Sequence, residues 1–169
     1  MNDYRRGYAP SNKTMSICDT APTIPAAPHE MTFRDWRSDK EGQQQLAWPS
    51  KKQGNCGDCW AFGSTEQIRS DYKRSTGNDS GLLSMQQMAS CAPSDSNLNT
   101  LDPASTVGGC KGNDPEWAFL YANAVGLLKD SAYKYENGTC TTTSDDGMCA
   151  TLPCGYKGTP NVFVKDCFM

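Results

Sequence analysis

The sequence predicts a single disulfide-bonded domain that is helical in its middle and irregular at both ends. Three observations lead to this prediction: a length of 169 residues, which is typical of one domain, nine cysteines, and three helix-like segments in the middle of the chain. The formal charge is −3 and the basic residues are scattered, so we expect no nucleic-acid partner. No stretch approaches the roughly 18 apolar residues that span a bilayer, so we expect no membrane segment in this sequence.

The first helix is expected from about Cys59 to Ser75. Small and apolar side chains recur on one face of this segment at helical spacing, while charged side chains lie elsewhere. Asp58 is suited to cap its start, because a short carboxylate can accept a hydrogen bond from a free backbone N–H of the first turn. Gly77 is suited to end it, because glycine adopts the left-handed conformation without strain.

Two shorter helices follow. Ser84, with Gln87 three residues later, forms a capping-box pattern that announces a helix ending near Cys91. Asp114 and Pro115 form a cap and first-turn pair in front of the segment "EWAFLYANAV". The sequence therefore predicts three helices in order, separated by a long polar loop after the second.

Cys56 and Cys59 lie three residues apart directly in front of the first helix, a spacing that suits a metal knuckle, a redox pair or a nucleophile. A zinc site needs four converging ligands, but no second pair has this spacing and the one histidine is His29. A redox pair should follow a strand, and "WPSKKQGN" does not have a strand pattern. The nucleophile is the interpretation that we favour.

Under that interpretation Cys59 occupies the first turn of the helix, where the helix dipole and free backbone N–H groups stabilise the thiolate that attacks. Cys56 is then available for a disulfide. Gln53 lies six residues before Cys59, and Gly54 and Gly57 allow a tight turn between them. Its side-chain N–H and the backbone N–H of Cys59 would form a two-donor oxyanion hole.

The segment "QGNCGDCWAFGSTEQIRSDY" resembles the active-site segment of the papain-like cysteine proteases. Further segments resemble the same family in order: "MTFRDWRSD", "LLSMQQMASC", "GGCKGNDPEWAF" and "SAYKYENGTC". The resemblance implies an α+β, papain-like fold of which the chain covers mainly the helical left domain and lacks most of the barrel-like right domain. It implies a leader over 1–26, whose position suggests the end of a propeptide, a left domain over 27–145, and a Cys-rich tail over 146–169 that begins the truncated remainder.

The resemblance also assigns roles to individual residues. It makes Cys59 the nucleophile and Gln53 the oxyanion donor. The substrate-binding residues that it implies are Gly112, Asn113 and Trp60, and the disulfides that it implies are Cys56 with Cys110 and Cys91 with Cys140. Two positions depart from the family pattern. Asp58 replaces a Ser or Ala, which places a carboxylate beside the thiol and should oppose thiolate formation, and Asn113 replaces a cleft glycine.

A cysteine peptidase also needs an imidazole base and an amide that orients it. The family's His and Asn are expected beyond about position 189, and are therefore absent from this chain. His29 lies upstream in the Pro-rich leader and is not expected to replace them. We expect a cysteine-type peptidase that acts through a thioester, present here as a fragment inactive alone; the alternatives are a non-catalytic homologue that binds peptides or inhibits, and a structural secreted domain.

The resemblance implies no cofactor and no metal. Its partners are peptide or protein substrates and the missing right-hand domain or propeptide. Nine cysteines and the resemblance together favour a lysosomal, vacuolar or secreted location, although the first 30 residues contain no signal peptide.

Overall fold

The computed structural model of the chain describes residues 35–37, 45–93, 108–136, 151–160 and 162–164. The helices in this part are α1 (Cys59–Thr76), α2 (Met85–Cys91), the 3-10 helix η2 (Gly109–Lys111) and α3 (Pro115–Ala124). Two isolated antiparallel bridges accompany them, Leu83 with Lys129 and Leu127 with Val162. The three predicted α-helices are confirmed, with α1 ending one residue later than expected. Within the described residues, none of the helices is long and apolar enough to cross a bilayer.

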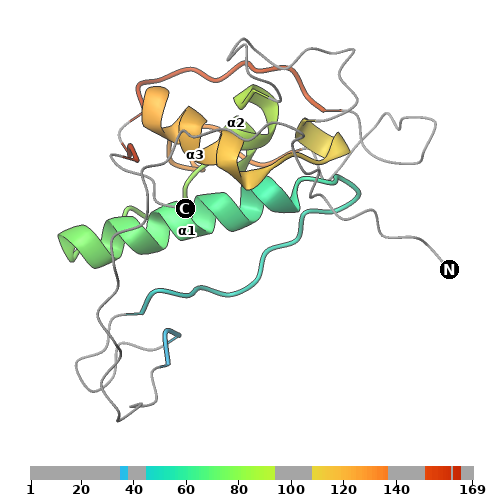
Figure 1. The fold of residues 1–169 in the computed structure, drawn as a ribbon. Helices are drawn as coiled ribbons and strands as arrows, with labels where there is room; N and C mark the ends of the chain where they lie inside the picture. The colour runs from blue at the N-terminus through green and yellow to red at the C-terminus, as the bar shows by residue number, and fades with distance from the viewer. Residues whose placement is uncertain (1–34, 38–44, 94–107, 137–150, 161, 165–169) are drawn as a thin grey trace, which may run out of the picture.

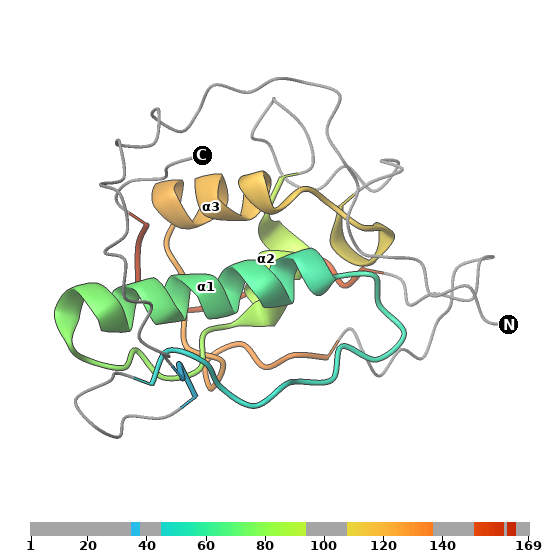
Figure 2. The ribbon, with the colours of Figure 1, turned by 60° about the horizontal axis from the view of Figure 1, so that its bottom comes forward.

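α1 is the central element of the fold. α2 and α3 pack against one side of it, and the extended segment 45–58 runs along the opposite side before turning back into its first residue (Figures 1 and 2). α1 buries Trp60, Ala61 and Ile68 in the core that it shares with the other helices. It ends at Gly77, which has a φ of 75° and donates its N–H to a carbonyl of the last turn at 2.8 Å. Packing of the apolar side of α1 in the core thus leaves its opposite side, which includes Cys59, exposed.

A buried arginine secures the far end of α1. Arg69 donates to both carboxylate oxygens of Asp79, at 2.8 and 2.7 Å, and its guanidinium lies 3.9 Å from the centroid of the Trp48 ring. The Arg69 hydrogen bonds hold the pKa of Asp79 at about 2. Because a planar guanidinium can bind a carboxylate and stack on an aromatic ring at the same time, this residue joins three segments of the chain.

α2 is buried along its whole length, and a polar side chain organises its contacts. The Gln87 amide nitrogen donates to the Tyr121 hydroxyl at 3.1 Å and to the Gly126 carbonyl at 3.0 Å. Its amide oxygen accepts from the Leu128 N–H at 2.8 Å. Buried backbone groups need hydrogen-bond partners, and the Gln87 side chain supplies them to the Gly126 carbonyl and the Leu128 N–H in the turn after α3.

Ser84 caps α2 as the sequence predicts, because its hydroxyl oxygen accepts from the Gln87 N–H at 2.9 Å. The same hydroxyl donates to the Tyr133 carbonyl at 2.6 Å. We expect Ser84→Ala to lower the free energy of unfolding by about 1–2 kcal/mol, measured by urea denaturation. Ser75→Ala, at an exposed serine near the end of α1, is the control and should change it by less than about 0.5 kcal/mol. Equal effects of the two variants would contradict the capping role.

Segment 45–58 is fastened to α1 by polar contacts. The Ser70 hydroxyl donates to the Leu46 carbonyl at 2.6 Å, and Lys51 forms an ion pair with Glu66. These contacts set the path by which the chain approaches the first turn of α1.

The described residues beyond position 150 pack on the helical part. Val162 and Leu127 exchange backbone hydrogen bonds of 3.3 and 2.7 Å, and the Tyr133 hydroxyl donates to the Pro153 carbonyl at 3.2 Å. The expected division of the chain near residue 145 stays a prediction.

Candidate active site

Cys59 is the first residue of α1, and its thiol is exposed and free. The other cysteines in the described part of the chain are all in disulfides. A nucleophile at this position has unpaired backbone N–H groups of the first helical turn around it. Among the cysteines that the structure describes, only Cys59 therefore keeps a chemically available thiol, at the place the sequence indicates.

Three contacts join the turn before α1, and the first turn of α1 itself, to the loop around η2. Cys56 forms a disulfide with Cys110, as the resemblance implies, and the two Cα atoms are 4.5 Å apart. The Gly57 N–H donates to the Cys110 carbonyl at 2.9 Å. The buried Trp60 indole donates to the Gly109 carbonyl at 3.0 Å. Trp60 therefore has a packing and anchoring role beside Cys59.

The two residues after η2 are both buried, and their expected roles in substrate binding stay predictions. Gly112 is buried, has a φ of 86° and accepts from the Gly108 N–H through its carbonyl. Asn113 is only 2% exposed. Its side chain donates to the Pro93 carbonyl at 3.0 Å and accepts from the Asp114 N–H at 2.9 Å. The Asn113 side chain thus joins the loop around η2 to the end of α2 and to the start of α3.

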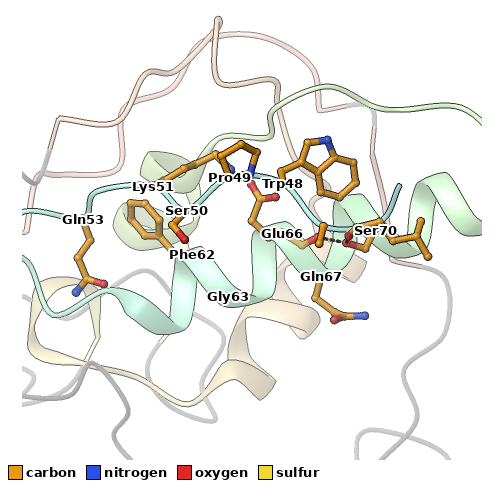
Figure 3. Close-up of a pocket in the computed structure, with 12 residues that line it drawn as sticks. Trp48, Pro49, Ser50, Lys51, Gln53, Phe62, Gly63, Glu66, Gln67 and Ser70 are labelled. Carbon is orange, nitrogen blue, oxygen red and sulfur yellow. Dashed lines mark hydrogen bonds and ion pairs between the residues drawn. The ribbon is translucent and has the colours of Figure 1, made fainter. Parts of the chain in front are cut away.

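Gln53 lies at the end of segment 45–58 that is nearest the start of α1 (Figure 3). Its side-chain nitrogen donates to the Cys56 carbonyl at 2.7 Å, which turns the amide toward the cysteine turn. An amide nitrogen carries two hydrogens, so one remains for a further acceptor. The role of Gln53 as an oxyanion donor stays a prediction.

Two hollows meet on the exposed side of α1. A groove of about 380 Å³ lies between segment 45–58 and α1, and its lining includes Gln53 and Phe62 (Figure 3). A second hollow of about 280 Å³ lies between α1 and α3, and its lining includes Cys59 and Phe119. Both are bordered by Gly63 and Gln67 on α1. Cys59 and Gln53 thus border two hollows that share Gly63 and Gln67 as lining residues.

Asp58 does not cap α1, although it occupies the N-cap position. Its side chain accepts no capping hydrogen bond and is fully buried, whereas the next residue, Cys59, is exposed. Burial raises the pKa of Asp58 to about 7, and a contact with the Tyr135 phenol partly offsets this. The predicted cap is therefore wrong, because the carboxyl points into the core instead of back toward the free N–H groups.

The pairing expected for Cys91 is also wrong. Cys91, at the end of α2, forms a disulfide with Cys154, and the two Cα atoms are 4.9 Å apart. Cys140 lies outside the described residues. Contacts of Pro153 with Tyr133 bring Cys154 to α2, and sequence spacing contains no signal of such a contact.

Sequence reasoning missed Tyr135 as a neighbour of the site. Its hydroxyl donates to the Gln53 carbonyl at 2.8 Å, and its ring meets that of Phe62 edge-on with 4.8 Å between centroids. The aromatic segment "AYKYE" was the available signal, but nothing in the sequence indicates that it contacts Gln53, which lies 82 residues earlier. In the described part of the chain, no three His, Cys, Asp or Glu side chains gather in a way that could hold a metal ion.

Comparison with known proteins agrees with this geometry. A sequence model of the papain family cysteine proteases matches residues 31–162. The chain is 36% identical over 116 residues to Pro-cathepsin H of Medicago truncatula, which covers 67% of this chain and 29% of that protein. It is 36% identical over 110 residues to the Oryzain gamma chain of Oryza sativa subsp. japonica, covering 63% of this chain and 26% of that protein. The chain thus spans less than a third of the length of these relatives.

Solved structures give the same result. The Carica candamarcensis cysteine protease CMS1MS2 in complex with E-64 superposes with a TM-score of 0.52 and 26% identity, over 79% of this chain and 49% of that one. The bromelain protease from Ananas comosus, in complex with the E64 inhibitor, superposes with a TM-score of 0.54 and 27% identity, over 78% of this chain and 48% of that one. These matches confirm the α+β, papain-like fold class, and the mostly helical described part corresponds to its left domain. The chain belongs to the papain family of cysteine proteases.

Proposed function

We propose that the protein is a cysteine-type peptidase that hydrolyses peptide bonds through a Cys59 thiolate and a thioester intermediate. The observation that carries this proposal is the free, exposed thiol of Cys59 at the first position of α1. A thiolate is the attacking form, and the start of a helix favours it.

Attack on a peptide carbonyl places negative charge on its oxygen, and the backbone N–H of Cys59 and the free N–H of Gln53 are the donors that we assign to it. The Gln53–Cys56 hydrogen bond supports this assignment, because it holds the amide in the turn that leads to the thiol. The thioester then forms as the amine leaves, and water hydrolyses it to release the second product.

The proton transfers need a base, which the one histidine of this sequence, His29, does not supply in our proposal. We assign the His and Asn to the half of the family fold that this chain does not span. Peptide or protein substrates would bind extended across the concave surface beside Cys59, along the loop that contains Gly112. The right-hand domain and a propeptide are the proposed partners. Two disulfides indicate an oxidising compartment, and we propose the lysosome, the vacuole or the outside of the cell.

The test is made on the product of the longest reading frame that contains this chain, secreted from a eukaryotic host. We expect hydrolysis of fluorogenic peptides and covalent labelling by E-64 at the peptide containing Cys59. Cys59→Ser should abolish the labelling and lower the rate by at least about a thousandfold, the usual order for removing a catalytic nucleophile. Ser75→Ala, on the same helix at an exposed site, should leave both unchanged. Peptide binding without hydrolysis or labelling would overturn the proposal in favour of a non-catalytic homologue.

A further inference from the structure

A buried acid lies next to the exposed thiol. Asp58 is 0% exposed, and neither of its carboxyl oxygens has a hydrogen-bond donor that satisfies it. A carboxylate in such a place is unfavourable, because burial removes its hydration and the contact with Tyr135 replaces only part of it. The geometry therefore favours the neutral carboxyl, which carries a proton that it can donate.

The Tyr135 hydroxyl is in contact with this carboxyl and also reaches the Gln53 carbonyl, to which it donates at 2.8 Å. A phenol has one proton, so while Tyr135 donates to Gln53 it cannot also donate to Asp58. Its oxygen, however, can accept. A neutral Asp58 can thus complete a chain in which the carboxyl donates to Tyr135 and Tyr135 donates to Gln53.

Within the residues that the structure describes, few other charges lie near this group. On its own segment the neighbouring ionisable side chain is the exposed Cys59, and on the facing segment it is Tyr135. Lys51, on the segment that carries Gln53, pairs with Glu66. Phe62, the α1 side chain against which the Tyr135 ring packs, is apolar. The protonation of Asp58 therefore depends on burial first and on the Tyr135 hydroxyl second.

We propose that Asp58 is a positioning residue that, through Tyr135, controls the hydrogen bond supporting Gln53. When Asp58 is neutral, its carboxyl O–H donates a hydrogen bond to the Tyr135 oxygen, and the Tyr135 O–H donates a hydrogen bond to the Gln53 carbonyl. When Asp58 loses its proton to solvent, the Tyr135 O–H turns and donates its hydrogen bond to the Asp58 carboxylate. The Gln53 carbonyl then has no hydrogen bond from Tyr135. The consequence for catalysis rests on the proposed function of Gln53 as an oxyanion donor.

The NMR signal of the Gln53 carbonyl carbon can be resolved from those of all other residues. The sequence contains a single Gln-Gly pair, Gln53 with Gly54. A chain labelled with carbonyl-13C glutamine and 15N glycine therefore gives one HNCO cross-peak, and its carbon frequency reports the hydrogen bond to Tyr135. In the full chain we expect this frequency to move upfield between pH 5 and 9, with a midpoint near pH 7.

Three variants make the test specific. Asp58→Asn keeps a neutral donor and should hold the cross-peak at its low-pH position throughout. Tyr135→Phe removes the donor and should place the peak at the unbonded position at every pH. Asp71→Asn, which removes a carboxylate near the other end of α1, should titrate like the wild type.

A flat wild-type profile, or a titration that persists in Asp58→Asn, would overturn the proposal. If one variant does not fold, the wild-type profile and the other variant still decide it. The outcome is separable from that of the proposed function. A titrating carbonyl in a protein that does not hydrolyse peptides removes only the catalytic role of Gln53, whereas a flat carbonyl in an active peptidase removes only the role of Asp58.

Discussion

Replacing Cys56 and Cys110 together by alanine is expected to lower the free energy of unfolding by about 4 kcal/mol. The disulfide joins residues 54 apart in the sequence, so its loss frees a large loop in the unfolded chain. Both cysteines are only 1% exposed, and their removal also takes packed sulfur atoms out of the interior. Denaturation in urea measures the loss. A change below about 1 kcal/mol would show that the other contacts of this turn hold it without the cross-link.

The second disulfide provides a matched control. Cys91 and Cys154 are separated by 63 residues, so their double alanine variant should lose a similar amount of stability by the same entropic mechanism. Only the Cys56–Cys110 pair, however, ties the turn before Cys59 to the loop around η2. We therefore expect the Gln53–Gly54 cross-peak to shift when Cys56 and Cys110 are replaced, and to stay in place in the control. A shift of the same size in both variants would contradict a local role for the first disulfide.

Asp58 is expected to lower the free energy of unfolding of the wild type by about 3 kcal/mol as the pH rises from 4.5 to 8, and Asp58→Asn is expected to abolish this decrease. The pKa of Asp58 is about 7 in the folded chain, well above its ordinary value of 3.8. Between these values the folded chain holds a proton that the unfolded chain has released, so the free energy of unfolding falls as pH rises. Above the folded pKa both states are ionised, and the full cost of a buried carboxylate remains.

The measurement is a series of urea denaturations of wild type and Asp58→Asn across this range. Near pH 4.5 the two chains should be similarly stable, and near pH 8 the variant should be the more stable one. Asp79 offers a comparison of opposite sign, since its folded pKa is about 2 and its stabilising effect is lost only as the pH falls toward that value. Parallel curves for wild type and Asp58→Asn would show that Asp58 does not carry a raised pKa.

The helices could be predicted because their signals are local. Ser84 caps α2 through a residue three positions away, and Gly77 ends α1 within one turn. The position of Cys59 near the start of α1 follows from the helical spacing of the side chains after it, which is also a local signal. What could be predicted of the site is thus the part that one segment specifies by itself.

The errors all concern contacts between distant segments. Cys91 pairs with Cys154 because of how the chain beyond residue 150 folds back, and cysteine spacing does not encode that path. Asp58 has the residue type of a cap, but its side chain is buried beside Tyr135 instead. In each case the tertiary surroundings determine the role of a residue whose type alone suggested another.

The unequal burial of the sulfur atoms gives the protein an order of response to reductants. Thiol–disulfide exchange requires a thiolate to reach a sulfur atom, so an adduct on the exposed Cys59 should be reduced first. The Cys91–Cys154 bond, with Cys154 exposed, should follow, and the Cys56–Cys110 bond, closed off on both sides, should be the last to open. A mild reductant can therefore restore the thiol of Cys59 without loosening the turn that holds it, even though an oxidised cysteine lies three residues away.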